Sequence, residues 1–339
     1  MRYGAGDDGY SAATEAVEVW KKVCRKGENT MRVTSNMSYY MLLGSMGRLQ
    51  ESYHTTMEQI ATQKRINRPS DDPLGMMKVM DYKDVRKSVE QYKTNISTAT
   101  SYLSAAGVTL ENIDDALGKI KSLALGFAPS LDHTKDTIMN QIKDLTDQIA
   151  SFANNTFLGQ YLFSGSASYT KPFVEVPPAG SGVYEYANAS DGYYNDVREV
   201  KTGHDTTMSY TVPGNQIFEF TNSSGVALDL FGVLADLQNV MTTLPFNDAA
   251  FQAAIDDLGA GRQQIQHGLG LVSIKGIRFD IAGKHLNLLD KTMADLVDKT
   301  ESSNVEELAM LLSMQKVSLD ATYSVAAKLQ QTTILNFLR

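Results

Sequence analysis

A spacing of apolar residues that alternates between four and three positions constrains the fold of this chain more than any other feature. After Pro73 the pattern runs without a polar interruption through Val85, Val89, Tyr92, Ile96, Ala99, Leu103, Ala106, Leu110, Ile113, Leu117, Ile120 and Ala124. Such spacing places an apolar stripe along one side of a helix and selects a helical partner lying nearly parallel to it. At ~1.5 Å per residue this helix would be on the order of 60 Å long, so we expect the chain to lie beside other long helices.

The same spacing predicts helices over most of the remaining chain. One is expected over 38–63, the helix just described over 74–125, and a third between a turn at 127–131 and about 158. Two more are expected over 247–297 and 305–336. The apolar stripes near the two chain ends are predicted to pack between subunits, through Leu42, Met46, Leu49, Tyr53 and Ile60 near the N-terminus and Leu308, Leu312, Leu319, Ala326 and Leu329 near the C-terminus.

The segment between the first two helices contains signals that end one helix and begin the next. Pro69 cannot continue the preceding helix, because it lacks the backbone N–H that a helix interior requires. Asp72 is a good N-cap and Pro73 suits a first helical turn. Asp71 and Asp72 could also form a cation site, but capping accounts for both residues at lower cost.

The middle of the chain, 164–245, is rich in Gly, Ser, Thr, Tyr and Pro. Alternating runs at 182–186 and 216–220 predict strands, and 228–244 predicts a short helix. The expected fold is therefore mainly α with a small β insert, in which the N- and C-terminal regions form a long antiparallel helical bundle. We expect a terminal coiled-coil domain (31–63 with 305–339), a helical bundle domain (64–163 with 246–304) and a β-rich outer domain (164–245).

Composition excludes several classes of function. The net charge of −8 and the pI of about 5.2 argue against nucleic acid and anionic membranes as partners. No apolar stretch approaches the roughly 18 residues of a membrane span, and the N-terminus shows no ordinary secretory signal. Residues 1–30 hold the single cysteine, Cys24, and differ in character from the rest. They are either a mis-assigned start, with Met31 as the initiator, or a short extension.

The sequence offers no constellation that carries chemistry. The five histidines are scattered, and neither a metal-ligand cluster nor a phosphate-binding loop with its lysine is present. Gly4 to Gly9 matches the letters of a dinucleotide-binding loop, but no predicted strand precedes it and two aspartates occupy the phosphate position. We therefore expect no catalytic, cofactor-binding or metal-binding residues and no enzyme activity.

Four stretches of the sequence form recognisable motifs. The first is 64–73, with Arg65, Ile66, Asn67, Pro69, Ser70, Asp71, Asp72 and Pro73, and the others are 31–36, 161–165 (with Phe163 and Gly165) and 326–338. Together they resemble the flagellar hook-associated protein 3 family, flagellin-like proteins of the hook–filament junction. The segment 64–73 is the most specific, while the other three resemble, in order, the family's start, its exit from the helical hairpin and the flagellin-type C-terminus. The resemblance covers 31–339.

The resemblance implies a structural component of the bacterial flagellum that lies outside the cell and is exported through the flagellar type III apparatus. Implied partners are copies of the chain in a ring, the hook-side junction protein (hook-associated protein 1), flagellin, and an export chaperone on the C-terminal helix. The terminal helices would form an axial pair whose stripes stay uncovered in a monomer and are buried between neighbours. Two other functions stay open: a flagellin-type filament subunit, and a cytoplasmic coiled-coil scaffold or signalling protein.

Overall fold

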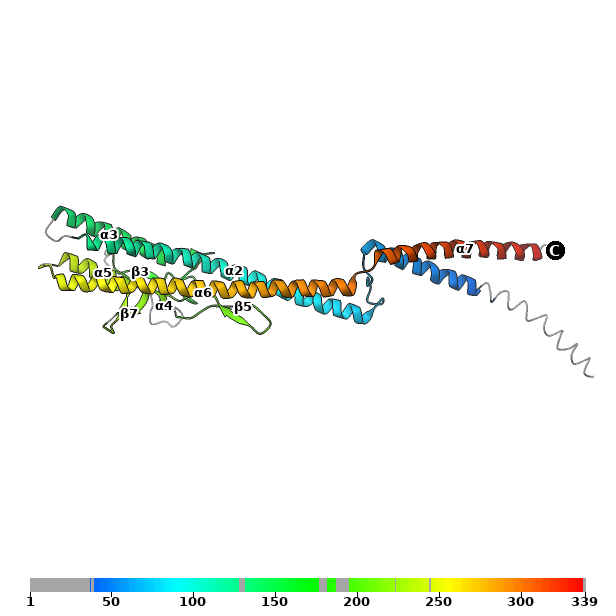
Figure 1. Ribbon diagram of the computed structural model, residues 1–339, viewed down its shortest axis with the longest axis horizontal. Coiled ribbons are helices and arrows are strands. Elements are labelled where there is room, and N and C mark those ends of the chain that lie inside the picture. Colours follow the sequence, from blue (N-terminus) through cyan, green and yellow to red (C-terminus); the bar gives the residue numbers. More distant parts are fainter. Residues whose placement is uncertain are drawn as a thin grey trace, which may run out of the picture. The chain divides into compact units, whose positions relative to one another are not determined.

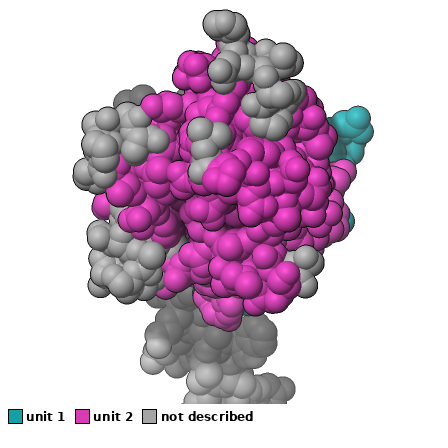
Figure 2. All heavy atoms as spheres, turned by 90° about the vertical axis from the view of Figure 1, so that its left-hand side faces the viewer, with its two compact units in different colours: residues 1–82, 295–339 teal, residues 83–294 magenta. Residues whose placement is uncertain are grey.

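The computed structural model contains two compact units, residues 1–82 with 295–339 (unit 1) and residues 83–294 (unit 2). Figure 2 distinguishes the two units by colour. The structure describes residues 37, 40–127, 132–176, 182–186, 195–222, 224–243 and 245–337. Residues 1–30, and the family-like start at 31–36, lie outside the described part.

Unit 1 is built on two antiparallel helices, one over 40–62 and α7 (Val305–Phe337). The direction follows from two contacts: the Ser303 N–H donates to the Gln63 carbonyl, and the Gln315 Nε2 donates to the Ser52 hydroxyl at 2.9 Å. The two helices lie alongside each other in Figure 1 (blue and orange to red). Asn304 caps α7 by accepting from the N–H groups of Glu306 and Glu307. The predicted helices at both chain ends are thus present over the described residues.

Unit 2 contains three long helices, α2 (Pro73–Leu125, which begins in unit 1), α3 (Asp132–Ala153) and α6 (Asp248–Glu301, which ends in unit 1). The antiparallel arrangement of α2 and α6 is fixed by ion pairs near both ends of their contact: Arg262 binds Asp114, while Asp290 binds both Arg86 and Lys93. The predicted α2 stripe is buried from Val89 to Ala124 apart from a half-buried Tyr92, whereas Val85 remains 40% exposed. The long-helix prediction is confirmed.

Between α3 and α6, the described residues form four antiparallel two-stranded sheets and two short helices. The sheets are β1 (Thr156–Phe157) with β2 (Gln160–Tyr161), β3 (Phe173–Glu175) with β4 (Tyr184–Tyr186), β5 (Glu199–Lys201) with β6 (Thr207–Ser209), and β7 (Glu219–Thr221) with β8 (Ala227–Asp229). The helices are α4 (Asn215–Phe218) and α5 (Leu230–Thr242). The structure is mainly helical with a small β component, which confirms the expected fold class.

An aromatic cluster holds this middle segment on the helices. Phe163, Phe173, Phe218 and Phe231 are each at most 1% exposed, and their rings pack with centroid distances of 4.8–6.0 Å. All four belong to the same buried cluster as Leu110 and Ile120 of α2 and Leu258 of α6. The segment treated above as an outer domain therefore shares its hydrophobic core with the helical bundle.

Two predicted elements differ from the structure. The run 216–220 was expected as a strand, but Asn215–Phe218 forms α4 and only Glu219 onward is extended. Ile217 and Phe218 are adjacent and both buried, which a helical turn permits and an alternating strand does not. The third helix ends at Ala153, earlier than expected, because Leu158 (φ 52°) and Gly159 (φ 76°) form the tight turn of the β1–β2 hairpin.

Asp229 gives the fold a pH dependence that can be measured. It caps α5 by accepting from the Gly232 N–H at 3.3 Å and lies opposite Glu219 in the β7–β8 ladder. Burial, reinforced by the Glu219 charge, raises the pKa of Asp229 to about 6 from an ordinary value of 3.8. The folded state therefore binds this proton more tightly than the unfolded chain. The contribution of Asp229 to stability is greatest below pH about 4 and falls as the pH rises through about 6.

We expect Asp229→Asn to remove this fall while keeping a capping oxygen. The free energy of unfolding of the variant minus that of the wild type should be about 2 kcal/mol larger at pH 7.5 than at pH 4.5, since one pKa unit corresponds to about 1.4 kcal/mol. Urea unfolding of both proteins at the two pH values measures the difference. An equal effect of the substitution at both pH values would contradict the raised pKa.

Candidate assembly surface

The motif segment is joined through its backbone to the connection between α6 and α7. The Arg65 N–H donates to the Glu301 carbonyl at 2.7 Å, and Lys64 forms an antiparallel bridge with Ser302. Gln63 turns the chain into this bridge with φ of 58°. The end of the N-terminal helix is thereby fixed to the start of the C-terminal helix.

Two basic side chains strengthen the same junction. The Lys64 Nζ lies 2.9 Å from a carboxylate oxygen of Glu301, whose side chain is 11% exposed. Arg65 donates from Nη2 to the carbonyl of Thr300 at 3.1 Å and to the Asp72 carboxylate at 3.2 Å. A cation near the C-terminal carbonyls of α6 is favourable because these carbonyls carry the negative end of the helix dipole. Arg65 therefore links the end of α6 to the start of α2.

The two aspartates of the motif organise the loop backbone. Asp71 Oδ2 accepts from the N–H groups of Asn67 and Arg68 at 3.0 and 2.8 Å. Asp72 Oδ1 accepts from the Gly75 N–H at 2.9 Å, which confirms the predicted cap of α2. That hydrogen bond, helped by Arg65, holds the pKa of Asp72 below its usual range. Pro69 and Ser70 lie exposed at the turn.

Ile66 anchors the loop, and Gly75, against which it packs, is not among the predicted site residues. Ile66 is 1% exposed and packs against Gly75. A Cβ atom on Gly75 would lie 2.6 Å from Ile66 Cδ1 and 2.5 Å from Asp72 Oδ2, which is closer than such atoms approach. Only glycine fits there without movement of its neighbours. A glycine in the first turn of a predicted helix, directly after the motif, was the available signal.

Gly75→Ala is expected to destabilise unit 1 by about 1–3 kcal/mol, because Ile66 or the Asp72 cap must move. The measurement combines thermal unfolding with the rate of tryptic cleavage after Lys64 and Arg65, which should rise. Gly276→Ala is the control: Gly276 lies inside α6 with nothing within 4 Å of the added atom. The Gly276→Ala variant should be more stable than the wild type by about 0.5–1 kcal/mol, because alanine has a higher helix propensity than glycine. Equal effects of the two substitutions would show that the Ile66–Gly75 contact is unimportant.

The other two motif residues lie in unit 2. Phe163 is fully buried, and its ring packs edge-on to Phe218 with a centroid distance of 5.5 Å. Gly165 is buried and has φ of 60°, a conformation that glycine adopts most easily. The structure places both residues where the middle segment leaves α3 and β2, as core and turn residues.

The predicted terminal stripes face each other inside the chain. We call the two together the inner stripe. Its described residues are half-buried except Leu319 of α7, which is 7% exposed. The half-buried residues are Leu42, Met46, Leu49, Tyr53 and Ile60 on the N-terminal helix and Leu308, Leu312 and Ala326 on α7. The side chain of Leu329 lies outside the described part. Within a single chain these stripes are therefore partly covered. Whether these residues also contact neighbouring subunits stays a prediction.

A different set of apolar side chains remains exposed on the same two helices. We use the name outer stripe for the four residues of α7 that share one side of the helix, Met310, Met314, Val317 and Val325, which are 48–69% exposed. On the N-terminal helix Met41, Leu43 and Met57 are also exposed, at 65%, 38% and 46%. Met310, Met314 and Val317 follow the 4-3 spacing. Helices with two apolar faces have one face left for a further partner. The outer stripe is therefore the candidate assembly surface of unit 1.

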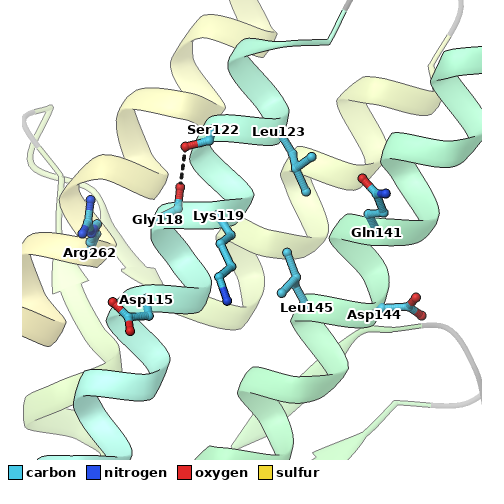
Figure 3. Close-up of a pocket in the computed structure, with 9 residues that line it drawn as sticks. All are labelled: Asp115, Gly118, Lys119, Ser122, Leu123, Gln141, Asp144, Leu145 and Arg262. Atoms are coloured by element: carbon cyan, nitrogen blue, oxygen red, sulfur yellow. Dashed lines mark hydrogen bonds between the residues drawn. The ribbon is translucent and has the colours of Figure 1, made fainter.

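An open groove of about 820 Å³ lies between α2 and α3 in unit 2, with Arg262 of α6 at its side (Figure 3). Leu123 and Leu145 contribute its apolar lining. Ser122 supplies the only hydroxyl among the described lining residues, and it donates to the Gly118 carbonyl at 3.0 Å. Arg262 is committed to Asp114 through two hydrogen bonds of 2.9 and 3.0 Å. The cation at the side of this groove is thus already engaged in joining α6 to α2.

Nowhere among the described residues do three or more His, Cys, Asp or Glu side chains gather as they would around a metal ion. Within the same part of the chain, none of the helices combines the length and apolarity of a bilayer span.

Comparison with known proteins identifies similar chains. Residues 33–168 match the family model of the bacterial flagellin N-terminal helical region. Flagellar hook-associated protein 3 of Escherichia coli (strain K12) is 23% identical over 326 residues, covering 88% of this chain and 97% of the relative. A flagellar filament 30.7 kDa core protein of Treponema maltophilum is 26% identical over 141 residues, covering 40% of this chain and 49% of that protein.

A solved structure described as a flagellar hook-associated protein from Vibrio parahaemolyticus has the same fold, with a TM-score of 0.58 at 19% identity. The superposition covers 67% of this chain and 100% of the other chain. The chain thus resembles flagellar hook-associated protein 3 over 88% of its length, and residues 33–168 resemble the N-terminal helical region of bacterial flagellins.

Proposed function

We propose that this protein is a structural component of the bacterial flagellum, an adaptor outside the cell at the hook–filament junction. The observation that carries the proposal is the match to flagellar hook-associated protein 3 over 88% of this chain, whereas the filament core protein matches only 40% of the chain. The structure supports a role in assembly, because α7 keeps an exposed apolar outer stripe while the inner stripe is partly covered.

The adaptor acts by packing helical stripes against neighbouring subunits. Copies of the chain form a ring, with the hook-side junction protein on one side and flagellin on the other. The outer stripe of unit 1 supplies apolar contact area, which stabilises association by roughly 25 cal/mol per Å² buried before the costs of ordering are subtracted. Before export, a chaperone shields the C-terminal helix, whose exposed methionines and valines would otherwise aggregate.

The test deletes the gene for this chain and then restores it with an epitope-tagged copy. The deletion strain should carry hooks without filaments and release flagellin into the medium, and the tagged copy should restore swimming. Immunogold electron microscopy should place the tag at the boundary between hook and filament.

The other functions predict different results in the same experiment. Label along the whole filament would indicate a flagellin-type subunit, the reading that the N-terminal helical region alone would favour. Protein found only in cell lysate, with normal flagella in the deletion strain, would indicate a cytoplasmic scaffold and would refute the adaptor.

A further inference from the structure

The outer side of α6 carries a second apolar stripe that no described part of the chain covers. Ile274, Ile277, Ile281 and Leu288 are 57%, 60%, 61% and 64% exposed, at spacings of three, four and seven residues. The same stretch of α6 buries Val272, Phe279 and Leu286 in the bundle core. We call the four exposed residues the α6 outer stripe. Three exposed isoleucines at coiled-coil spacing are unusual on a helix that faces only water.

The charges beside this stripe are basic in an otherwise acidic chain. Residues 260–289 hold Arg262, Lys275, Arg278 and Lys284 but a single acidic residue, Asp280, in a chain whose net charge is −8. Arg262 is bound to Asp114, and Lys275 donates to Ser209 and Thr211 within the chain. Arg278 and Lys284 are exposed beside the stripe, and Lys284 pairs with Asp280 at 2.6 Å. A partner for this surface should therefore be a helix with acidic flanks.

Such a helical face is present on α2 in the same unit. We call it the α2 outer face; its residues follow the 4-3 spacing and are all exposed: Glu90, Thr94, Ser97, Ser101, Ser104, Val108, Glu111 and Asp115. Its centre consists of small side chains and its ends are acidic. Serine and threonine leave shallow gaps between the turns of a helix, into which larger side chains of a facing helix can insert. The set contains no basic residue.

We propose that the α6 outer stripe of one copy docks on the α2 outer face of the next copy. Isoleucine side chains would enter the gaps between the serines, while Arg278 and Lys284 approach the glutamates of α2. Both faces belong to unit 2, and they are different faces of one molecule. Each copy then presents its α6 outer stripe to one neighbour and its α2 outer face to the other, which is a head-to-tail contact. Such contacts close into a ring when the rotation that relates neighbouring copies divides a full turn evenly. This inference rests on the proposed function and names the lateral contact within the ring.

Cysteine cross-linking in assembled flagella tests the contact. In a Cys24→Ser background, which removes the only native cysteine, Ile277→Cys is combined in turn with Ser101→Cys, Ser104→Cys and Val108→Cys. The full-length variants are expressed in the deletion strain. Sheared flagella that retain the hook are then oxidised with copper phenanthroline, which converts two facing thiols into a disulfide. At least one pair should give a ladder of covalent oligomers of this chain that collapses on reduction.

Controls separate this contact from other arrangements. Each single-cysteine variant should remain monomeric on a denaturing gel, because the two faces differ. Ile277→Cys with Val226→Cys should also stay monomeric, since Val226 is 51% exposed but lies in the β7–β8 turn. Covalent dimers from Ile277→Cys alone would indicate contact between two α6 helices and would overturn the proposal. Motile cells with the protein in their flagella but no ladder from any pair would also overturn it, while leaving the proposed function intact. Absence of the wild-type protein from flagella would refute both.

Discussion

Leu319→Asp is expected to abolish filament formation and swimming while leaving unit 2 folded. Leu319 is 7% exposed on the inner stripe of α7, facing the helix over 40–62. A carboxylate placed there loses its hydration without gaining a partner of opposite charge, which costs several kcal/mol. The two terminal helices should separate, and the outer stripe that depends on their pairing should lose its shape. Unit 2 contains no part of α7, so its packing should be unaffected.

The measurement has two parts. Swimming and electron microscopy report assembly, and circular dichroism during thermal unfolding reports whether the transition of unit 2 is retained. Ala327→Asp is the matched control, because Ala327 is exposed on α7 outside both stripes. It adds the same charge to the same helix and should be tolerated. Normal filaments from the Leu319→Asp strain would show that the pairing of the terminal helices is not needed for assembly.

Phe218→Ala is expected to destabilise unit 2 by about 3–5 kcal/mol, the usual cost of removing a fully packed aromatic side chain. Phe218 is 1% exposed and contacts the rings of Phe163, Phe173 and Phe231. Its removal opens a cavity at the centre of the aromatic cluster that fixes the middle segment to the helices. In a unit of this size the melting temperature should fall by roughly 10 °C.

Tyr169→Ala is the control for this variant, because Tyr169 is an aromatic residue of the same segment that is 78% exposed. It should change the stability by less than about 0.5 kcal/mol. Differential scanning calorimetry of both variants checks the contrast. A small effect of Phe218→Ala would mean that the middle segment and the helices unfold independently, as separate domains would.

The two substitutions also separate the two proposed roles of packing. Leu319→Asp should remove assembly without lowering the stability of unit 2, and Phe218→Ala should lower that stability with the terminal pair intact. If both variants instead lost assembly and stability together, the two units would not be independent structures.

The sequence by itself predicted the long helices and the loop that restarts α2. The uninterrupted stripe from Val89 to Ala124 and the Asp72 cap depend on neighbours close in sequence, and the structure shows both. The run 216–220 was misread because alternation of apolar residues over five positions does not distinguish a strand from one helical turn followed by a strand. The burial of Phe218 depends on the distant Phe163 and Phe173, and Ile217 lies against Gly268 of α6, neighbours that a local pattern does not contain.

Tertiary structure alone decided which apolar face meets which partner. Spacing shows that a helix has a stripe, but it does not identify the surface that covers it, because any apolar stripe can pack on another. Leu42 and Leu319 of the predicted stripes are half-buried and buried within the chain, whereas Met314 and Ile277 are exposed. The fit of Ile66 against Gly75 was hidden for the same reason, since close approach is a property of the folded chain.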